Sequence, residues 1–379
     1  MSPSSLTRRS LLESYFRLAP VSVPLYAILL ASLVGSLFIL GAGGNPLVAY
    51  SALLDGALGS PDRIASTIAR ATPFMIAALA VVVGFKAGLF NIGAEGQLLL
   101  GALTAAWVGT WSWLAGVSAL LAVPFVLAAG VVGGMVWGGI PGFLKARTGA
   151  HEVITTIMLN AIAAGLAQFL ITTRDPALLI DEAASTPHTR QVVDSVRLPT
   201  LVEGTGLHLG ILLALALCVV TWFVLERTTP GFEIRTVGVN RDAARYAGMR
   251  VNRTIVVVLT ASGALAGIAG AAEVVGGGSG YLTPGSYTNI GFDSIAIALL
   301  ARGNPLAVIP AALLWGAMLS GAPLMQVQAD LSVNLVRIVQ ALIILFVAAD
   351  AIVRLLFRIR APRGVDAGES AVFTRGWGG

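Results

Sequence analysis

The sequence has a single cysteine and few charged residues. Cys218 is the only cysteine among 379 residues, which excludes a disulfide framework and a metal site built from paired thiolates. Charged side chains make up 11% of the chain, whereas soluble proteins carry about 25%. So few charges could not cover the surface of a soluble protein, so the composition excludes that class.

Several motifs of common enzyme classes are also missing. No Gly-x-x-x-x-Gly-Lys-Ser/Thr loop is present, and the glycine-rich run 276–280 lacks the lysine, so the chain cannot hydrolyse ATP by itself. His151-Glu152 is not a zinc motif, because Thr155 occupies the place of the second histidine. There is no Gly-x-Ser-x-Gly elbow either. We therefore expect no enzyme activity, no cofactor and no metal site.

Long apolar runs dominate what is present. Hydrophobic residues make up 56% of the chain and the mean hydropathy is +0.85. A membrane-spanning helix needs about 20 apolar residues. We predict an all-α membrane protein, a polytopic bundle of about ten transmembrane helices with short broken or re-entrant segments; eight or nine spans remain open. The segments are 21–42, 64–84 (interrupted by Pro73), 89–110, 114–140, 152–172, 207–225, 254–276, 291–301, 305–321 and 333–353.

The positive charges indicate an orientation. The net charge of +5 could suggest a nucleic-acid partner, but the basic residues cluster at the ends of apolar runs, as membrane orientation produces, so we expect none. With the N-terminus inside, the outer loops hold only Arg63, Arg174, Arg190 and Arg197. The positive-inside rule therefore predicts that both termini are cytoplasmic. Residues 21–40 lack a small-residue cleavage site and are interpreted as a retained first helix, not a signal peptide.

This topology predicts three regions. They are a cytoplasmic N-terminal segment (1–20), a transmembrane domain (21–353) and a cytoplasmic basic tail (354–379). Within the domain, the outer loop 173–206 is polar and mixed in charge. It is either a solvated cap or a docking surface for an extracytoplasmic partner.

The inner loop 226–253 is long enough to have a structure of its own. Thr229-Pro230 is typical of a helix start, and Gly248 suits a helix C-terminus, so we predict two short amphipathic helices meeting near Val239-Asn240. Such helices either lie on the membrane surface or dock a cytoplasmic motor domain. The candidates for contact with such a domain are Phe232, Glu233, Arg235, Gly238, Asn240, Arg245 and Tyr246, with Val237 also on a contact face.

The stretch 88–97 places polar groups inside an apolar region. Buried polar groups in a membrane must be satisfied, so the stretch predicts a helix junction that faces protein or a water-filled cavity. It is either a tight turn or a polar packing element beside a translocation path; we favour the second. Glu95 and Asp293 could instead cap neighbouring helices. The candidates for the path or for polar packing are Asn91, Glu95, Gln97, Asn160 and Asp293, with Phe90 and Phe292.

Five stretches together resemble the permease subunits of ABC importers. They are 69–73, 90–97 (Phe-Asn-Ile-Gly-Ala-Glu-Gly-Gln), 150–160 (beginning Ala-His-Glu-Val-Ile), 231–249 and 291–300. The chain is similar to the branched-chain amino acid, ribose and simple-sugar permeases, and most to their nucleoside-type branch. The 231–249 stretch resembles the family's coupling loop, although it departs from the Glu-Ala-Ala pattern of other ABC importers.

The resemblance implies partners and a cargo. It implies a cytoplasmic ABC ATPase subunit, a second permease subunit (identical or related), and an extracytoplasmic binding protein or lipoprotein, in the lipid of a bacterial inner membrane. The implied small-molecule cargo is a nucleoside; a simple sugar is the alternative, with branched-chain amino acids further behind. An ion-coupled secondary transporter using Glu95, Glu273 or Asp293 is the remaining rival, but it would not need the long inner loop.

Overall fold

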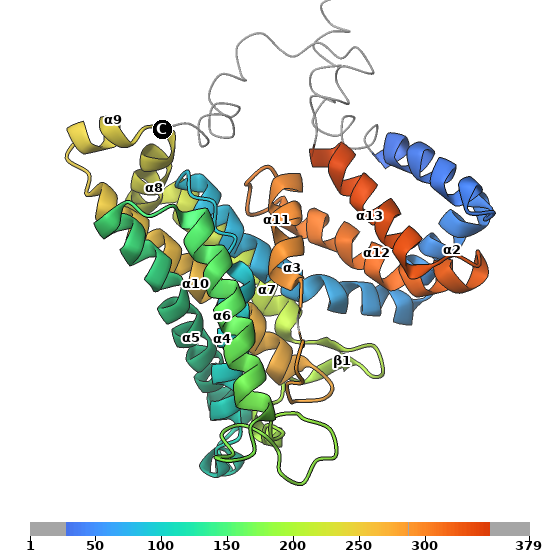
Figure 1. The fold of residues 1–379 in the computed structure, drawn as a ribbon, viewed down its shortest axis with the longest axis horizontal. Coiled ribbons are helices and arrows are strands. Elements are labelled where there is room, and N and C mark those ends of the chain that lie inside the picture. The colour runs from blue at the N-terminus through green and yellow to red at the C-terminus, as the bar shows by residue number, and fades with distance from the viewer. Residues whose placement is uncertain (1–27, 287, 349–379) are drawn as a thin grey trace, which may run out of the picture. The chain divides into compact units, whose positions relative to one another are not determined.

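The computed structural model describes residues 28–286 and 288–348, which are mainly helical (Figure 1). The predicted N-terminal segment, the start of the first helix and the basic tail lie outside these residues. The chain divides into two compact units. One comprises residues 57–319, and the other comprises the described residues 28–56 and 320–348. Each is described by itself.

The 57–319 unit contains most of the elements. Its helices, 3-10 turns and strands are α3 (Pro61–Lys86), α4 (Ala94–Gly109), η1 (Ser112–Gly116), α5 (Ala119–Thr148), α6 (Glu152–Thr172), η2 (Asp194–Val196), β1 (Thr200–Val202), β2 (Leu207–His208), α7 (Gly210–Arg227), α8 (Thr229–Val239), α9 (Arg241–Tyr246), α10 (Val251–Gly276) and α11 (Ile290–Leu300), followed by the first part of α12 (Val308–Gln328).

Helix α10 is the centre of this unit, packing against α3, α4 and α5 (Figure 1). Glycines allow the helix backbones to touch. A Cβ on Gly134 of α5 would collide with the carbonyl of Gly263, and one on Gly267 would collide with the carbonyl of Gly130. Close approach through small residues is how membrane helices gain dispersion energy, because lipid provides no hydrophobic drive between them.

Helix α3 is continuous, which corrects the prediction that Pro73 interrupts it. Proline removes one backbone hydrogen bond, but membrane helices tolerate this loss where surrounding helices pack closely. In the most apolar 18-residue stretch of α3, 83% of the residues are buried, which is consistent with such packing. Its N-terminus is capped by Ser60, whose side chain accepts from the amide of Arg63.

The segment between α6 and α7 is ordered over the end of α10. Strands β1 and β2 pair antiparallel, with Thr200 opposite His208. The amide of Leu198 donates to the carbonyl of Val275 (2.8 Å), and that of Val192 donates to Gly280 (2.9 Å). The predicted outer loop is therefore fastened to α10 by backbone hydrogen bonds.

His208 is buried in this fastening and predicts an acid-sensitive stability. Its Nδ1 accepts from the amide of Gly210 (3.0 Å), its ring lies against Gly276, and burial lowers its pKa. An unfolded histidine titrates near pH 6.5, so the unfolded chain takes up a proton that folded His208 resists. The contribution of His208 to the free energy of unfolding is therefore fully present above about pH 6.5. It is lost as the pH falls toward the lowered pKa of folded His208.

We expect the His208→Asn variant to lose part of this pH dependence, since its amide oxygen can still accept from Gly210 but does not titrate. The measurement is the unfolding temperature of the purified chain between pH 7 and pH 5. His188→Asn is the matched control, since the His188 ring stacks on Tyr281 at 4.4 Å outside this contact. An unchanged pH profile in His208→Asn would contradict the assignment.

The second unit contains the helical residues Ile28–Gly41, α2 (Pro46–Leu58, of which residues 46–56 belong here), the end of α12 and α13 (Val333–Ala348). The first two helices form a pair bent by 119°. The Tyr50 hydroxyl ties them together by donating to the carbonyl of Ser32 (2.8 Å). A Cβ on Gly321 of α12 would collide with the carbonyl of Leu53, so α2 and α12 are in backbone contact.

Each predicted apolar segment with described residues coincides with a helix, and the protein is a multi-pass membrane protein. Within residues 28–286 and 288–348, six helices are long and apolar enough to span a membrane, or seven if the bent pair counts as one span. Helices α4, α11 and α13 are shorter. Helix α2 was not predicted.

Candidate functional site

The 88–97 stretch forms the junction between α3 and α4, as the sequence predicts. Helix α3 ends at Lys86, and the chain turns through Gly88, whose φ of +64° is a conformation that favours glycine. The amide of Leu89 returns to the carbonyl of Gly84 (3.0 Å), which closes the helix end. Residues 87–93 are called the junction segment below.

Asn91 is the centre of a buried hydrogen-bond network in this segment. Its Nδ2 donates to Gln97 Oε1 (2.9 Å) and to Ser262 Oγ (2.6 Å). Its Oδ1 accepts from the amide of Gly93 (3.0 Å) and from Gln97 Nε2 (3.1 Å). Ser262 donates in turn to the carbonyl of Ala80 (2.5 Å). These side chains are buried and satisfied, so they join α3, α4 and α10 at one point.

Ser262 is the member of this network that the sequence did not reveal. It lies 171 residues from Asn91 and is fully buried. A serine among the alanines and glycines of 261–267 is the only signal in the sequence, and it is not specific.

Asn160 of α6 joins the junction from the other side. Its Oδ1 accepts from the amide of Gly96 (2.9 Å), and its Nδ2 donates to the carbonyl of Ile92 (2.9 Å). Both groups lie at the start of α4, where backbone amides have no partner within the helix. Asn160 therefore anchors α6 to the first turn of α4.

Glu95 caps α11. Its two carboxylate oxygens accept from the amides of Asn289 (2.6 Å) and Gly291 (2.7 Å). A carboxylate there also opposes the positive end of the helix dipole. The first turns of α4 and α11 are in contact, since a Cβ on Gly291 would collide with the backbone of Glu95. The capping alternative is therefore confirmed for Glu95.

We expect Glu95→Gln to weaken this contact without preventing insertion. The amide oxygen can accept from one backbone N–H, but the amide nitrogen then faces the other donor. Hydrogen bonds to charged groups contribute about 1.5–3 kcal/mol, so a loss of that order is expected in unfolding free energy. Thermal unfolding and transport should be measured together. An unchanged unfolding temperature together with normal transport in Glu95→Gln would contradict the role of Glu95 as the cap of α11.

The other candidates of this group, Phe90, Phe292 and Asp293, lie next to it. Phe90 is half-buried, with its ring 5.2 Å from that of Phe85. Phe292 is 41% exposed, and Asp293 is half-buried in the first turn of α11, next to the amides that Glu95 caps. The structure thus brings Asn91, Gln97 and Asn160 together in the interior and leaves Phe292 at the surface of the unit.

The 226–253 segment contains two short helices, as predicted. The side chain of Thr228, one residue before the predicted start, caps α8 by accepting from the amide of Gly231. Asn240 ends α8 and caps α9, accepting from the amides of Asp242 and Ala243 (both 3.0 Å). Gly248, with φ +83°, turns the chain toward α10. The helices meet at Val239-Asn240.

The end of α8 packs directly on the junction segment. A Cβ on Gly238 would collide with the carbonyl of Lys86 and lie 3.0 Å from the amide nitrogen of Gly88. The guanidinium of Arg241 donates to the carbonyl of Gly88 (3.4 Å). Arg235 pairs with Glu226 (2.5 Å), and Lys86 lies 3.8 Å from the same carboxylate. The two predicted sites are therefore physically connected.

The remaining side chains of α8 and α9 differ in exposure. Val237 is buried within the protein, whereas Phe232 is 54% and Tyr246 is 97% exposed. Arg245 pairs with Asp242 at 3.0 Å. Glu233 makes no ion pair with any residue that the structure describes. Two large exposed side chains without a hydrogen bond or ring contact to the described residues are typical of a contact surface.

Comparisons with known proteins cover most of the chain. It is 40% identical to the guanosine ABC transporter permease protein NupP of Bacillus subtilis, over 92% of this chain and 99% of the relative. It is 35% identical to a nucleoside ABC transporter permease protein of Lactococcus lactis, over 89% of this chain and 93% of that relative. It is also 35% identical to a glucose ABC transporter permease protein of Haloferax volcanii, over 85% of this chain and 86% of that relative.

No solved structure matches the fold closely enough to add to these comparisons. The family whose description is branched-chain amino acid transport system permease component matches residues 63–348. This range includes the junction segment, the network around Asn91 and both short helices. The chain belongs to that family of permeases.

Proposed function

We propose that this protein is the transmembrane subunit of an ATP-driven nucleoside importer in a bacterial cytoplasmic membrane. The cargo is inferred from the 40% identity to a guanosine permease over 99% of that protein's length. A nucleoside relative at 35% identity supports it. A glucose relative of equal identity keeps a simple sugar as the second candidate.

The importer takes its energy and its substrate from other subunits. A cytoplasmic ABC ATPase hydrolyses ATP, a second permease subunit (identical or related) completes the pathway, and an extracytoplasmic binding protein or lipoprotein delivers the nucleoside. The orientation has both termini in the cytoplasm, with α8 and α9 on the cytoplasmic side, because basic residues gather there. The ordered 173–206 segment then faces the binding protein.

Helices α8 and α9 couple the ATPase to the permease. Phe232 and Tyr246 make the apolar contacts, while Glu233 and Arg245 provide charges at the rim. Gly238, Arg235 and Asn240 act from within the chain: they hold α8 against the junction segment and set the angle between the helices. A displacement of α8 is transmitted to Gly88, and from there to the network around Asn91.

The candidates at the junction have two different roles. Asn91, Gln97 and Asn160 are polar packing residues, because each is buried and satisfied within the chain. Glu95 positions α11. Phe292 and Asp293, on the first turn of that helix, are the residues we place nearest the translocation path, with Phe90 behind them.

Uptake by cells tests the proposal. Radiolabelled nucleoside and pentose uptake are compared in cells with and without this subunit, and nucleoside uptake should be lost without it. Unchanged nucleoside uptake alongside lost sugar uptake would move the protein to the sugar branch. Purified protein in liposomes tests the other rival, since ion-driven uptake without an ATPase would overturn the ATP-driven mechanism.

A further inference from the structure

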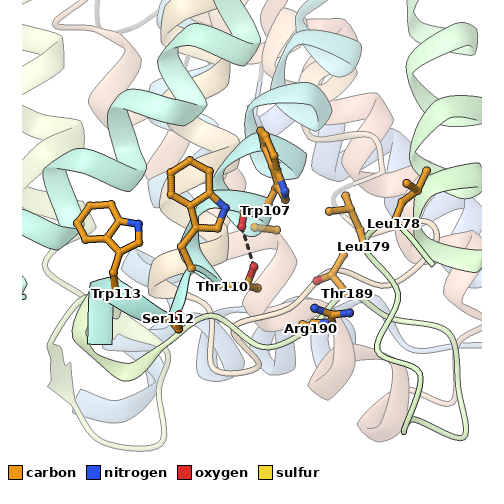
Figure 2. Close-up of a pocket in the computed structure, with 10 residues that line it drawn as sticks. Trp107, Thr110, Ser112, Trp113, Leu178, Leu179, Thr189 and Arg190 are labelled. Carbon is orange, nitrogen blue, oxygen red and sulfur yellow. Dashed lines mark hydrogen bonds between the residues drawn. The ribbon is translucent and has the colours of Figure 1, made fainter. Parts of the chain in front are cut away.

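A cavity of about 470 Å³ lies in the 57–319 unit, at the C-terminal end of α4 (Figure 2). Its wall on one side comes from the last turn of α4 and from η1, including Trp107, Trp111 and Trp113. The other side comes from the segment after α6, through Leu178, Leu179, Thr189 and Arg190 (Figure 2). The proposed function places the 173–206 segment, which supplies this second wall, on the side of the binding protein, but it gives the cavity itself no role.

The lining offers hydrogen-bond donors without a negative charge to receive them. The guanidinium of Arg190 has no ion pair or hydrogen bond with any residue that the structure describes, and the same holds for the three indole N–H groups. No carboxylate lines the cavity. Arg190 is exposed, so its guanidinium is open to a ligand that enters the cavity. A guanidinium and donor-only indoles in one lining favour a ligand that is anionic and rich in acceptors, with phosphate as a fitting partner.

Exposed apolar side chains follow the cavity-lining turn η1 in the chain, on the first turns of α5. The rings of Trp113 and Phe125 lie 5.4 Å apart, and Trp113 is 54% exposed. On the first turn of α5, Leu120 is 82% and Leu121 is 67% exposed. In a multi-pass membrane protein, tryptophans at helix ends mark the level of the lipid headgroups, and exposed leucines beside them face the acyl chains.

We propose that this cavity binds the phosphodiester headgroup of an anionic phospholipid. Arg190 binds the phosphate, the indole N–H groups of Trp107 and Trp113 donate to its oxygens or to the headgroup hydroxyls, and the acyl chains lie along Leu120 and Leu121. The absence of a carboxylate from the lining leaves a zwitterionic lipid's ammonium group without an ionic partner. Inorganic phosphate shares the headgroup chemistry but lacks the chains.

The test uses the full chain purified in detergent. Native mass spectrometry measures the retention of phosphatidylglycerol and phosphatidylcholine supplied in equal amounts, and thermal unfolding is measured with each lipid and with inorganic phosphate alone. Arg190→Gln is compared with Arg174→Gln, a control on the same segment whose guanidinium donates to the carbonyl of Ala184 (3.4 Å) outside the cavity. Trp113→Leu removes an indole N–H but keeps an apolar side chain.

We expect selective retention of phosphatidylglycerol, weakened about tenfold by Arg190→Gln, as for the loss of one hydrogen bond to a charged group. Trp113→Leu should weaken it less, and Arg174→Gln should leave it unchanged. Equal retention of both lipids, or equal loss in both arginine variants, would overturn the proposal. Stabilisation by inorganic phosphate equal to that by the lipid would assign a free-anion site instead. Arg190→Gln that abolishes uptake with lipid retention intact would likewise overturn it, assigning the cavity to transport.

Discussion

Replacing Gly238 with leucine should abolish the proposed ATP-driven uptake, while the protein should still insert in the membrane. Any side chain at this position meets the backbone of Lys86 and Gly88, and neither backbone can move without displacing α3. Overpacking of this kind costs about 1–3 kcal/mol, which is enough to lift α8 from the junction segment. A motor docked on α8 would then move that helix without moving the junction.

Three measurements separate loss of coupling from loss of fold. They are the amount of protein in the membrane, co-purification of the ATPase subunit, and uptake of labelled nucleoside. Gly238→Ala should reduce uptake less than Gly238→Leu. Gly165→Ala is the matched control, because a Cβ on this helical glycine meets no atom within 4 Å. Normal transport in Gly238→Leu would contradict the assignment of α8 to ATPase coupling. Loss of the protein from the membrane would indicate that α8 has a purely structural role.

Exposed positions on the same helices isolate the docking surface. Tyr246→Ala and Glu233→Lys alter side chains that make no hydrogen bond, ion pair or ring contact with the part of the chain that the structure describes. We expect both to reduce ATPase co-purification and uptake with the unfolding temperature unchanged. Unaltered co-purification in both variants would place the motor elsewhere.

The helices of this protein were largely predictable because hydropathy and helix signals are local. The two short helices 229–239 and 241–246 follow from a proline near a helix start, an asparagine that can cap, and a glycine that can adopt positive φ. Helix α2 was missed for the same reason. It has 13 residues and follows the glycines at 43 and 44, so it falls below the length of a membrane span.

The connections of the candidate site were not predictable, because they join distant parts of the chain. That Asn91 needs a partner follows from its apolar surroundings, but the identity of Ser262 does not. Similarly, the sequence indicates that Gly238 lies in a helix and that Gly88 lies in a turn, but it does not indicate that the two are in contact. Only the folded backbone shows that a side chain on Gly238 would meet the turn at Gly88.

Asn91→Leu should destabilise the folded protein more than any other single change at the junction. Leucine has a similar volume but cannot bond to the amide of Gly93, to either polar atom of Gln97 or to Ser262. Each buried polar group left without a partner costs about 1–3 kcal/mol, and at least the Gly93 amide and the Gln97 side chain are affected. The unfolding temperature should fall by about 2–4 °C for each kcal/mol lost.

A double-mutant cycle distinguishes a connected network from independent contacts. Gln97→Leu alone also leaves Asn91 partly unsatisfied, so it should destabilise as well. In Asn91→Leu/Gln97→Leu the orphaned groups of both residues are absent together, and the combined loss should be smaller than the sum of the single losses by at least about 0.5 kcal/mol. Ser262→Ala, which removes one bond to Asn91 and one to Ala80, should show a smaller loss. Simple additivity of the two leucine variants would mean that these side chains do not act as one unit, and that α8 presses on a turn with no rigid connection to α10.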